Sequence, residues 1–523
     1  MPGTGLEDVQ SGSPQTAVGD DGSGDGAPHH RVVIIGAGFA GIGMAITLTR
    51  NGYRDVVVLE RAASVGGVWR ENTYPGCQCD VPSHLYSFSF APKHDWSRAY
   101  GLQAEIWDYL EDCADTFGVR GLIRFGVDVR QTRWDADLGR WRIATSAGEM
   151  TADVLVPAIG GLSAPSIPDL PGLETFEGVS FHSAAWRHDV DLSGKRVAVV
   201  GTGASAIQIV PEIQPRVAHL TVFQRTPPWI VPRMDHPISP AAQQRYRRFP
   251  VLQKVVRQWQ YWTREVTVLG FTRWPAMMWY ARHIARKHLT KQVSDPTLRE
   301  RLTPPYAIGC KRILLSDEWY PAIQQPNVEV VSGAVAEVRP NSVVTADGVE
   351  REVDVIILGT GFKVTAHPGF DFVHGRDGRS LGDVWRQEGM AAYRGTTAAG
   401  FPNMFIMTGP NTGLGHSSMV LMMESQFAYV LDAMRTMDRR GLAAVEPETR
   451  AQAEYNDRLQ ARLQRCVWNT GGCSSWYLDE RGRNPTLWPG FTWEYRMTTR
   501  RFDRAAYALT SRAARPAARA TSG

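Results

Sequence analysis

Two glycine-rich turns and one residue at a fixed distance from each predict two dinucleotide sites. The turns hold, in order, Gly36, Gly38 and Gly41, and then Gly201, Gly203 and Ala206. Glu60 stands 24 residues after the first glycine of the first turn (60 − 36), and Arg225 stands 24 residues after that of the second (225 − 201). In a strand–turn–helix–strand unit, the residue at this offset faces the adenosine ribose. A carboxylate suits ribose hydroxyls and an arginine suits a 2′-phosphate, so we expect FAD or NAD at the first turn, NADP at the second, and hydride transfer between them.

The elements needed to position these turns predict an α/β fold with two Rossmann-like dinucleotide-binding domains and a helical insertion in the second. Short apolar runs end at each turn, and prolines at 165, 168 and 171 mark a linker between the two units. We divide the chain into a disordered tail (1–30), the first nucleotide domain (31–160), the linker (161–194), the second nucleotide domain (195–237), the helical insertion (238–304), the rest of the second domain (305–365), the rest of the first (366–500) and a basic tail (501–523).

The insertion carries a stripe of large apolar side chains at helical spacing. Tyr246, Val255, Trp259 and Trp262 lie along part of it, three or four residues apart or at multiples of that spacing. Such a stripe can lie on a membrane surface, but it more often packs into a protein core. We therefore expect these side chains to be buried.

Composition is that of an ordinary globular enzyme. Of the 523 residues, 43% are hydrophobic and 21% are charged, and a net charge of +4 is too small to indicate nucleic acid or an anionic membrane as partner. No run of about 18 apolar residues predicts stable membrane insertion. The first thirty residues have no basic start or apolar run, so we expect a cytoplasmic protein.

The six cysteines are scattered and include no Cys-x-x-Cys pair. This spacing predicts neither a zinc site nor a redox-active cysteine pair, and we expect no metal. Cys77 and Cys79 could form a reactive pair, but the simpler interpretation is six buried or incidental thiols in a reducing cytoplasm.

A motif between the two glycine turns identifies a family. Phe176, Gly178, His182 and Trp186 fit F-x-G-x-x-x-H-x-x-x-W, the signature of type I Baeyer–Villiger monooxygenases, FAD- and NADPH-dependent enzymes that the chain resembles from about residue 31 to 500. A second family pattern is met by Gly67, Trp69 and Asp80. Two departures are Arg187, where the family commonly has Pro or Asp, and Ile159, where it usually has Thr.

The resemblance implies a reaction and roles for single residues. NADPH reduces FAD, O2 adds to give a C4a-peroxyflavin, and this species attacks a small hydrophobic ketone to give an ester or lactone. Arg312 matches the catalytic arginine and Asp80 the carboxylate that orients it. By the same resemblance, Arg225, Thr226 and Lys311 would bind the 2′-phosphate of NADP. Trp493 would contact the nicotinamide nucleotide. His182 and Trp186 would couple NADP binding to domain movement.

Three other functions stay open at this point. A flavin monooxygenase of sulfides or amines would share every motif except the linker signature and the Asp80/Arg312 match. An NADPH oxidase or reductase would insert no oxygen, and the lack of a redox cysteine pair argues against the reductase. A redox-sensing binding protein would need a partner surface, which neither the tails nor the charge pattern suggests. The oligomeric state cannot be predicted.

Overall fold

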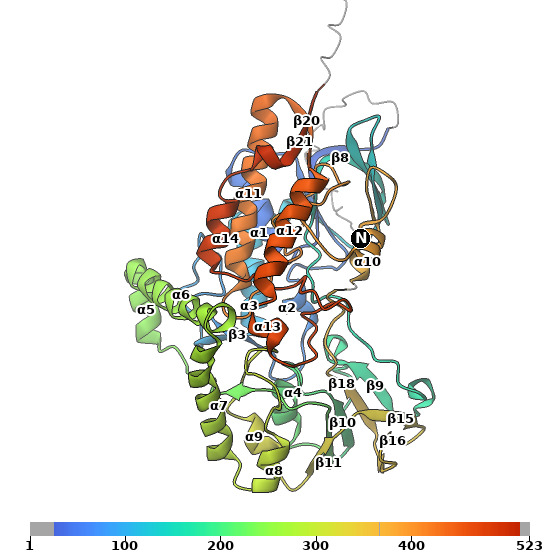
Figure 1. Ribbon diagram of the computed structural model, residues 1–523, viewed down its shortest axis with the longest axis vertical. Helices are drawn as coiled ribbons and strands as arrows, with labels where there is room; N and C mark the ends of the chain where they lie inside the picture. The colour runs from blue at the N-terminus through green and yellow to red at the C-terminus, as the bar shows by residue number, and fades with distance from the viewer. Residues whose placement is uncertain (1–25, 366, 513–523) are drawn as a thin grey trace, which may run out of the picture.

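A computed structural model describes residues 26–365 and 367–512. Figure 1 shows two sheet-based domains, the first above the second, with helices over and between them. The first sheet has seven strands in the order β19-β6-β7-β8-β1-β2-β5. Its strands are β1 (His29–Ile35), β2 (Val56–Glu60), β5 (Ile123–Phe125), β6 (Val129–Asp135), β7 (Arg140–Thr145), β8 (Gly148–Pro157) and β19 (Val373–His374).

The centre of this sheet is parallel and buried on both faces. β1 pairs in parallel with β2 and with β8, and residues 32–35 of β1 are all buried. Continuous Val and Ile runs are typical of parallel strands with both faces covered. Three helices build the core on one face: α1 (Phe39–Arg50), α3 (Gln103–Thr116) and α11 (Met419–Arg440). The α/β prediction is confirmed.

The second sheet is wholly parallel, in the order β14-β11-β10-β18-β9. Its strands are β10 (Arg196–Val200), β11 (His219–Gln224), β14 (Val328–Ser332), β18 (Val355–Leu358) and β9 (Val179–His182). The helix α4 (Ala206–Ile213) follows the second glycine turn. Because β9 is an edge strand of this sheet, part of the expected linker belongs to the second domain.

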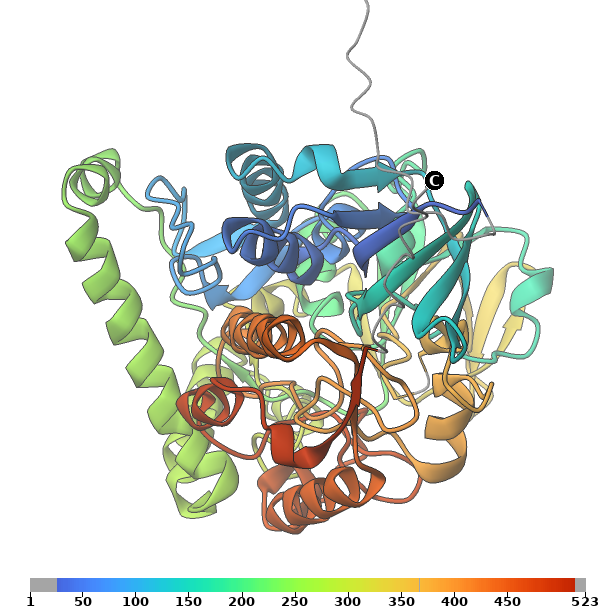
Figure 2. The ribbon, with the colours of Figure 1, turned by 90° about the horizontal axis from the view of Figure 1, so that it is seen from above.

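The expected insertion is helical, but its apolar stripe is not buried. The segment forms α5 (Pro240–Arg248), α6 (Pro250–Thr272), α7 (Met278–Gln292) and α8 (Pro296–Arg301), of which α5, α6 and α7 make up one side of the molecule in Figures 1 and 2. Trp259 is 68% exposed and Trp262 is 54% exposed. Expecting Val255, Trp259 and Trp262 to be core was wrong, because α6 buries Gln253 and Glu265 along this part instead. Tyr246 is half-buried and packs edge-on against His84 at 5.0 Å.

The chain ends also differ from expectation. β1 already begins at His29, within the expected tail. β21 (Tyr507–Ser511), within the expected basic tail, pairs with β20 (Leu442–Pro447). Residues 1–25 and 513–523 of the expected tails lie outside the described residues.

The other elements complete the two domains and the connections between them. They are α2 (Val68–Glu71), β3 (Gln78–Pro82), β4 (Tyr100–Leu102), β12 (Ile230–Val231), β13 (Leu314–Leu315), α9 (Trp319–Ala322), β15 (Val335–Arg339), β16 (Ser342–Thr345), β17 (Glu350–Glu352), α10 (Leu381–Glu388), α12 (Thr449–Leu463), α13 (Val467–Thr470) and α14 (Thr492–Thr499). Within residues 26–365 and 367–512, no helix combines the length and apolarity needed to cross a bilayer. The same residues hold no cluster of three His, Cys, Asp or Glu side chains that could bind a metal ion.

Candidate cofactor and catalytic site

The first glycine turn joins β1 to α1 and leaves room for a phosphate. Gly36 has φ +102°, and a Cβ there would lie 2.7 Å from the carbonyl oxygen of Ala158. A Cβ on Gly38 would meet only Gly67, at 3.6 Å or more, and no side chain caps the start of α1. A bare helix N-terminus behind a side-chain-free turn fits the pyrophosphate of a dinucleotide.

Glu60 ends β2 and lies against this turn. Its Oε2 accepts a hydrogen bond from the backbone N–H of Ala37 at 2.8 Å, and its Oε1 accepts one from Ala62 at 3.0 Å. Arg70 of α2 lies 3.3 Å from the same carboxylate. The side chain is thus fixed at the carboxyl end of the sheet, where ribose hydroxyls would meet it. Nearby, Trp69 donates to the hydroxyl of Tyr86 at 3.0 Å.

The second glycine turn repeats this arrangement between β10 and α4. Gly201 has φ +110°, and a Cβ there would lie 2.5 Å from the carbonyl oxygen of Gly359. Gly203 has no atom within 4 Å of the position of a Cβ, so the turn is open on that side. Ala206, where the first turn has Gly41, begins α4 and packs against Gly359.

Two cations from distant parts of the chain meet beside this second turn. Arg225 follows β11 and is exposed, and Lys311 is half-buried. Burial lowers the pKa of Lys311, and the nearby charge of Arg225 lowers it further. Neither side chain forms an ion pair with any described residue. Two unneutralised cations held together are suited to a phosphate dianion. Thr226 follows Arg225, and its backbone carbonyl accepts a hydrogen bond from the hydroxyl of Thr202 in the turn at 3.3 Å.

Asp80 and Arg312 form an ion pair between the two domains. Nε of Arg312 donates to Oδ2 of Asp80 at 2.6 Å, and Nη1 donates to the carbonyl of Leu414 at 3.1 Å. The two side chains are 28% and 31% exposed, so the pair is reachable from solvent. Burial would raise the pKa of Asp80, but the charge and hydrogen bond of Arg312 lower it below its ordinary value. The carboxylate in turn raises the pKa of Arg312, which stays charged.

The surroundings of this pair are electropositive on one side and apolar on the other. Arg233 donates to the carbonyl of Cys79 at 2.6 Å, and Arg264 also lowers the pKa of Asp80. Tyr477 lies beside the guanidinium, and burial raises its pKa to about 12, so the phenol stays neutral. Sequence reasoning named Asp80 and Arg312 but missed Tyr477 as an individual residue, since nothing in its spacing indicates this contact.

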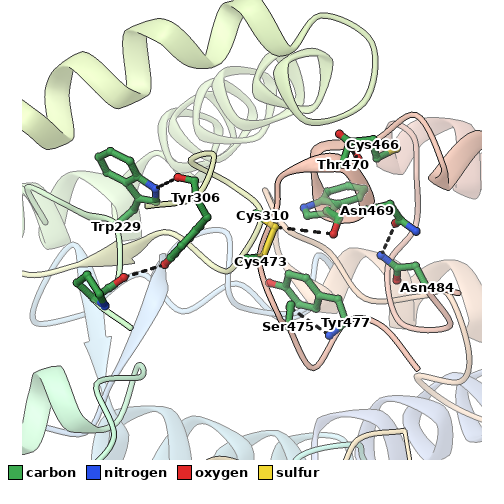
Figure 3. The surroundings of a disulfide bond; sticks show 12 residues. Trp229, Tyr306, Cys310, Cys466, Asn469, Thr470, Cys473, Ser475, Tyr477 and Asn484 are labelled. Atoms are coloured by element: carbon green, nitrogen blue, oxygen red, sulfur yellow. Dashed lines mark hydrogen bonds between the residues drawn. A yellow bond between two sulfur atoms is a disulfide. The ribbon is translucent and has the colours of Figure 1, made fainter. Parts of the chain in front are cut away.

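A disulfide lies next to the arginine. Cys310, two residues before Arg312, is bonded to Cys473 (Figure 3), and four cysteines are free: Cys77, Cys79, Cys113 and Cys466. The expectation of six unpaired thiols was therefore wrong for two of them. The two partners are 163 residues apart in sequence, and only the fold brings their Cα atoms to 6.1 Å. A hydrogen bond from Ala307 to the carbonyl of Gly471 ties the same two segments together.

The four residues of the linker motif pack along the second sheet rather than around the ion pair. A Cβ on Gly178 would lie 2.4 Å from the carbonyl oxygen of Asp354, so only glycine fits. His182 ends β9 beside Leu358 and is 4% exposed, and burial lowers its pKa. Trp186 packs edge-on against Phe181 at 5.1 Å. Phe176 packs against the core on one face of the sheet.

Trp493 is the second residue of α14, is 39% exposed and stacks on Phe491 at 5.3 Å. It forms no hydrogen bond or cation–π contact with Arg225 or Lys311. The structure thus brings together Asp80 with Arg312 and Arg225 with Lys311, while the aromatic contact of Trp493 is with Phe491.

Comparisons with known proteins agree with this geometry. Residues 29–374 match the family model described as flavin-binding monooxygenase-like. A Baeyer–Villiger monooxygenase of Streptomyces coelicolor is 54% identical, over 92% of either chain, and one of Pseudomonas aeruginosa is 51% identical, over 93% of this chain and 92% of its own. The crystal structure of OTEMO in complex with FAD and NADP superposes with a TM-score of 0.82 at 27% identity, covering 92% of this chain and all of that one. The chain therefore belongs to the flavin-binding monooxygenase-like family, and within it to the Baeyer–Villiger monooxygenases.

Proposed function

We propose that the Asp80–Arg312 pair is the catalytic centre at which one oxygen atom of O2 is inserted next to the carbonyl of a small hydrophobic ketone. FAD would bind at the first glycine turn and NADPH at the second. The observation that carries the proposal is the ion pair itself, which joins a first-domain strand to a second-domain loop at the seam between the two nucleotide sites. Bound FAD and NADPH would supply the electrons and the activated oxygen.

Arg312 would supply fixed positive charge. Oxygen transfer to a ketone requires an anionic nucleophile and develops negative charge on the carbonyl oxygen. One preorganised donor for such charge is worth about 3–4 kcal/mol of barrier. Asp80 and the carbonyl of Leu414 orient the guanidinium, and the raised pKa of Arg312 keeps it charged at every working pH.

Glu60 and the first turn would hold FAD. The carboxylate would accept hydrogen bonds from the ribose. Gly36 and Gly41 allow the tight turn and the close packing of α1, and Gly38, with only Gly67 near it, would let the pyrophosphate approach the backbone. Trp69 and Asp80 belong to the same sequence motif as Gly67 and would also line the FAD site. At the second turn, Arg225, Thr226 and Lys311 would hold the 2′-phosphate that distinguishes NADPH from NADH.

The side chains around Arg312 support a hydrophobic substrate. Residues flanking it belong to a buried apolar and aromatic cluster that includes Trp229, Ile308, Leu414, Trp468, Tyr477 and Leu487. Apolar walls with one or two convergent polar groups are typical of sites for small organic ligands. A ketone could place its carbonyl at the guanidinium and its carbon skeleton against this cluster.

The test separates reduction from oxygen insertion. Arg312→Ala should leave anaerobic reduction of the bound flavin by NADPH within a few-fold of wild type, because the nucleotide sites are intact. Ester formation under air, measured by product mass with oxygen-18, should fall by roughly 10²–10³-fold. Arg312→Lys should recover only part of the loss, since a lysine cannot reproduce the planar fork.

A matched control removes a different arginine pair. Arg31 forms an ion pair with Asp153 at 2.7 Å, at the end of β1 far from the glycine turn. Arg31→Ala should reduce neither rate beyond its effect on stability. Ester formation at a near wild-type rate in Arg312→Ala would show that the arginine is misassigned.

A further inference from the structure

The helix α6 buries two polar side chains, Gln253 and Glu265, and exposes a stripe of large apolar ones. Val251, Val255, Trp259, Trp262 and Val266 are each more than half exposed. At 100° per residue these five positions fall within an arc of about 80°. A surface helix of a globular protein normally buries such a stripe. In Figure 2, α6 runs along one edge of the molecule.

Buried polar contacts fix this orientation. Gln253 donates to the imidazole of His84 at 3.1 Å, and Arg257 donates to the backbone carbonyl of Ser87 at 3.0 Å. Glu265, fully buried, accepts hydrogen bonds from the backbone and hydroxyl of Thr492 at 2.9 and 2.7 Å. Rotating the helix to bury the tryptophans would break all of these bonds, so the outward face is a property of the fold.

The exposed apolar surface continues beyond α6. Trp274, Trp279 and Tyr280 are 57%, 61% and 64% exposed, and Phe249 before α6 is 51% exposed. Eleven large apolar side chains between residues 249 and 280 are exposed: Phe249, Val251, Leu252, Val255, Trp259, Trp262, Val266, Trp274, Met277, Trp279 and Tyr280. We call these eleven side chains the outer face. Five of them form one stripe along α6, and an exposed apolar stripe marks an interaction surface rather than scattered exposure.

The charges around the outer face have one sign. Residues 240–292, all of them described, include a single carboxylate, Glu265, which is buried. Nine cationic side chains of the same segment are exposed: Arg245, Arg247, Arg248, Lys254, Arg273, Arg282, Arg286, Lys287 and Lys291. The net charge of the whole chain is only +4, so the positive charge is concentrated here.

We propose that the outer face docks the enzyme on an anionic phospholipid bilayer, with α6 and the start of α7 lying in the plane of the interface. Tryptophan and tyrosine at the headgroup level, aliphatic side chains between them and surrounding lysines and arginines are the composition of interfacial helices. Docking of this kind needs no spanning helix. It would also bring a hydrophobic ketone dissolved in the bilayer close to the protein.

The charge pattern disfavours a second copy of the chain as the occupant. A two-fold symmetric contact through this face would bring the nine exposed cations of one copy against the same nine of the other, with no exposed carboxylate in residues 240–292 to neutralise them. Nucleic acid would satisfy the charge, but it would leave the aliphatic side chains of α6 in contact with a polar backbone. An anionic bilayer satisfies both the charge and the apolar surface.

The test measures partition of the FAD-loaded full chain onto vesicles. Co-sedimentation with phosphatidylcholine vesicles containing phosphatidylglycerol should greatly exceed that with phosphatidylcholine alone, and salt should weaken it. Lys254→Gln/Arg273→Gln (the lysine variant) should lower the partition coefficient about 30-fold, since each such cation near an anionic surface contributes about fivefold. Trp259→Ser/Trp262→Ser should lower it at least tenfold. Both double variants should keep wild-type ketone turnover in the absence of vesicles.

A matched control carries the same charge change elsewhere. Arg450 and Arg458 on α12 are 88% and 72% exposed, and Arg450→Gln/Arg458→Gln should bind vesicles as wild type does. Equal loss in this control and in the lysine variant would overturn the proposal, as would wild-type binding with no preference for anionic lipid. A dimer that Trp259→Ser/Trp262→Ser converts to monomer would assign the face to a second copy, and retention by oligonucleotides but not vesicles would assign it to nucleic acid. Either result would overturn docking on lipid.

Discussion

Protonation of His84 should loosen the attachment of α6. The imidazole is 5% exposed, and its Nδ1 receives a hydrogen bond from Gln253, while Arg257 donates to its backbone carbonyl. Burial, together with the nearby charge of Arg257, lowers the pKa of His84 from 6.5 to about 4. A protonated ring would lose its acceptor and place a second positive charge beside Arg257. Both Gln253 and Arg257 belong to α6, so detachment of this helix exposes His84 to solvent.

The sign and size follow from these values. A group whose pKa is lowered by folding contributes stability that is fully present above its unfolded pKa and is lost as pH falls toward the folded value. For His84 the window runs from pH 6.5 down to about 4. At pH 5 the difference from the unfolded value is about 1.5 units, which corresponds to about 2 kcal/mol, or an opening equilibrium about 30-fold more favourable.

Hydrogen exchange read by mass spectrometry isolates this local opening. After correction for the intrinsic rate, amides of residues 250–272 should exchange about 30-fold faster at pH 5 than at pH 8 in wild type. His84→Gln keeps an acceptor for Gln253 but cannot be protonated, so most of the difference should disappear. His236→Gln, at an exposed histidine, is the control. If His84→Gln keeps the full wild-type pH dependence, the attachment of α6 does not depend on the charge of this ring.

Three further predictions concern the nucleotide sites and the disulfide. Gly36→Ala should weaken FAD binding at least tenfold, because a Cβ there would lie 2.7 Å from a backbone carbonyl oxygen. The measurement is the flavin content after dialysis. Gly52→Ala is the control, since Gly52 also has a positive φ but has open space around it, and it should bind FAD as wild type does. Arg225→Gln should raise the KM for NADPH by about 10–100-fold and leave that for NADH nearly unchanged, because one charge-assisted contact to the 2′-phosphate is lost. A thiol titration should count four free thiols in the denatured, unreduced protein and six in the reduced protein. Cys473→Ser should lower the free energy of unfolding by at most about 5 kcal/mol, which is the entropic cost of closing a loop of this length. Six thiols without reductant would contradict the bond.

The glycine turns could be predicted from sequence because their chemistry is local. Gly36 and Glu60, like Gly201 and Arg225, sit in a short unit in which strand length and helix start fix where the side chains go. The fold class, a first dinucleotide without a 2′-phosphate and NADP as the second follow from that, whereas the choice of FAD over NAD came from the resemblance to a family. The Asp80–Arg312 contact spans 232 positions and was reachable only through resemblance to a family.

Residues brought together by distant segments escaped prediction for a physical reason. Cys310 and Cys473, and Tyr477 beside Arg312, meet because two loops pack together, and no local spacing encodes that packing. The stripe on α6 shows a different failure. Its period correctly predicted a helix, but period alone cannot tell which face is buried. Here Glu265 and Gln253 find buried partners, and those hydrogen bonds outweigh the usual preference for burying tryptophan.

The disulfide next to Arg312 also has a mechanical consequence. It fastens the loop that carries the arginine to the segment after α13, so these two points cannot separate when the nucleotide domains move against each other. Any rotation of one domain against the other would have to pivot near this bond. Displacement grows with distance from a pivot. Because Cys473 and Asp80 both belong to the first domain, such a pivot would keep Arg312 close to Asp80.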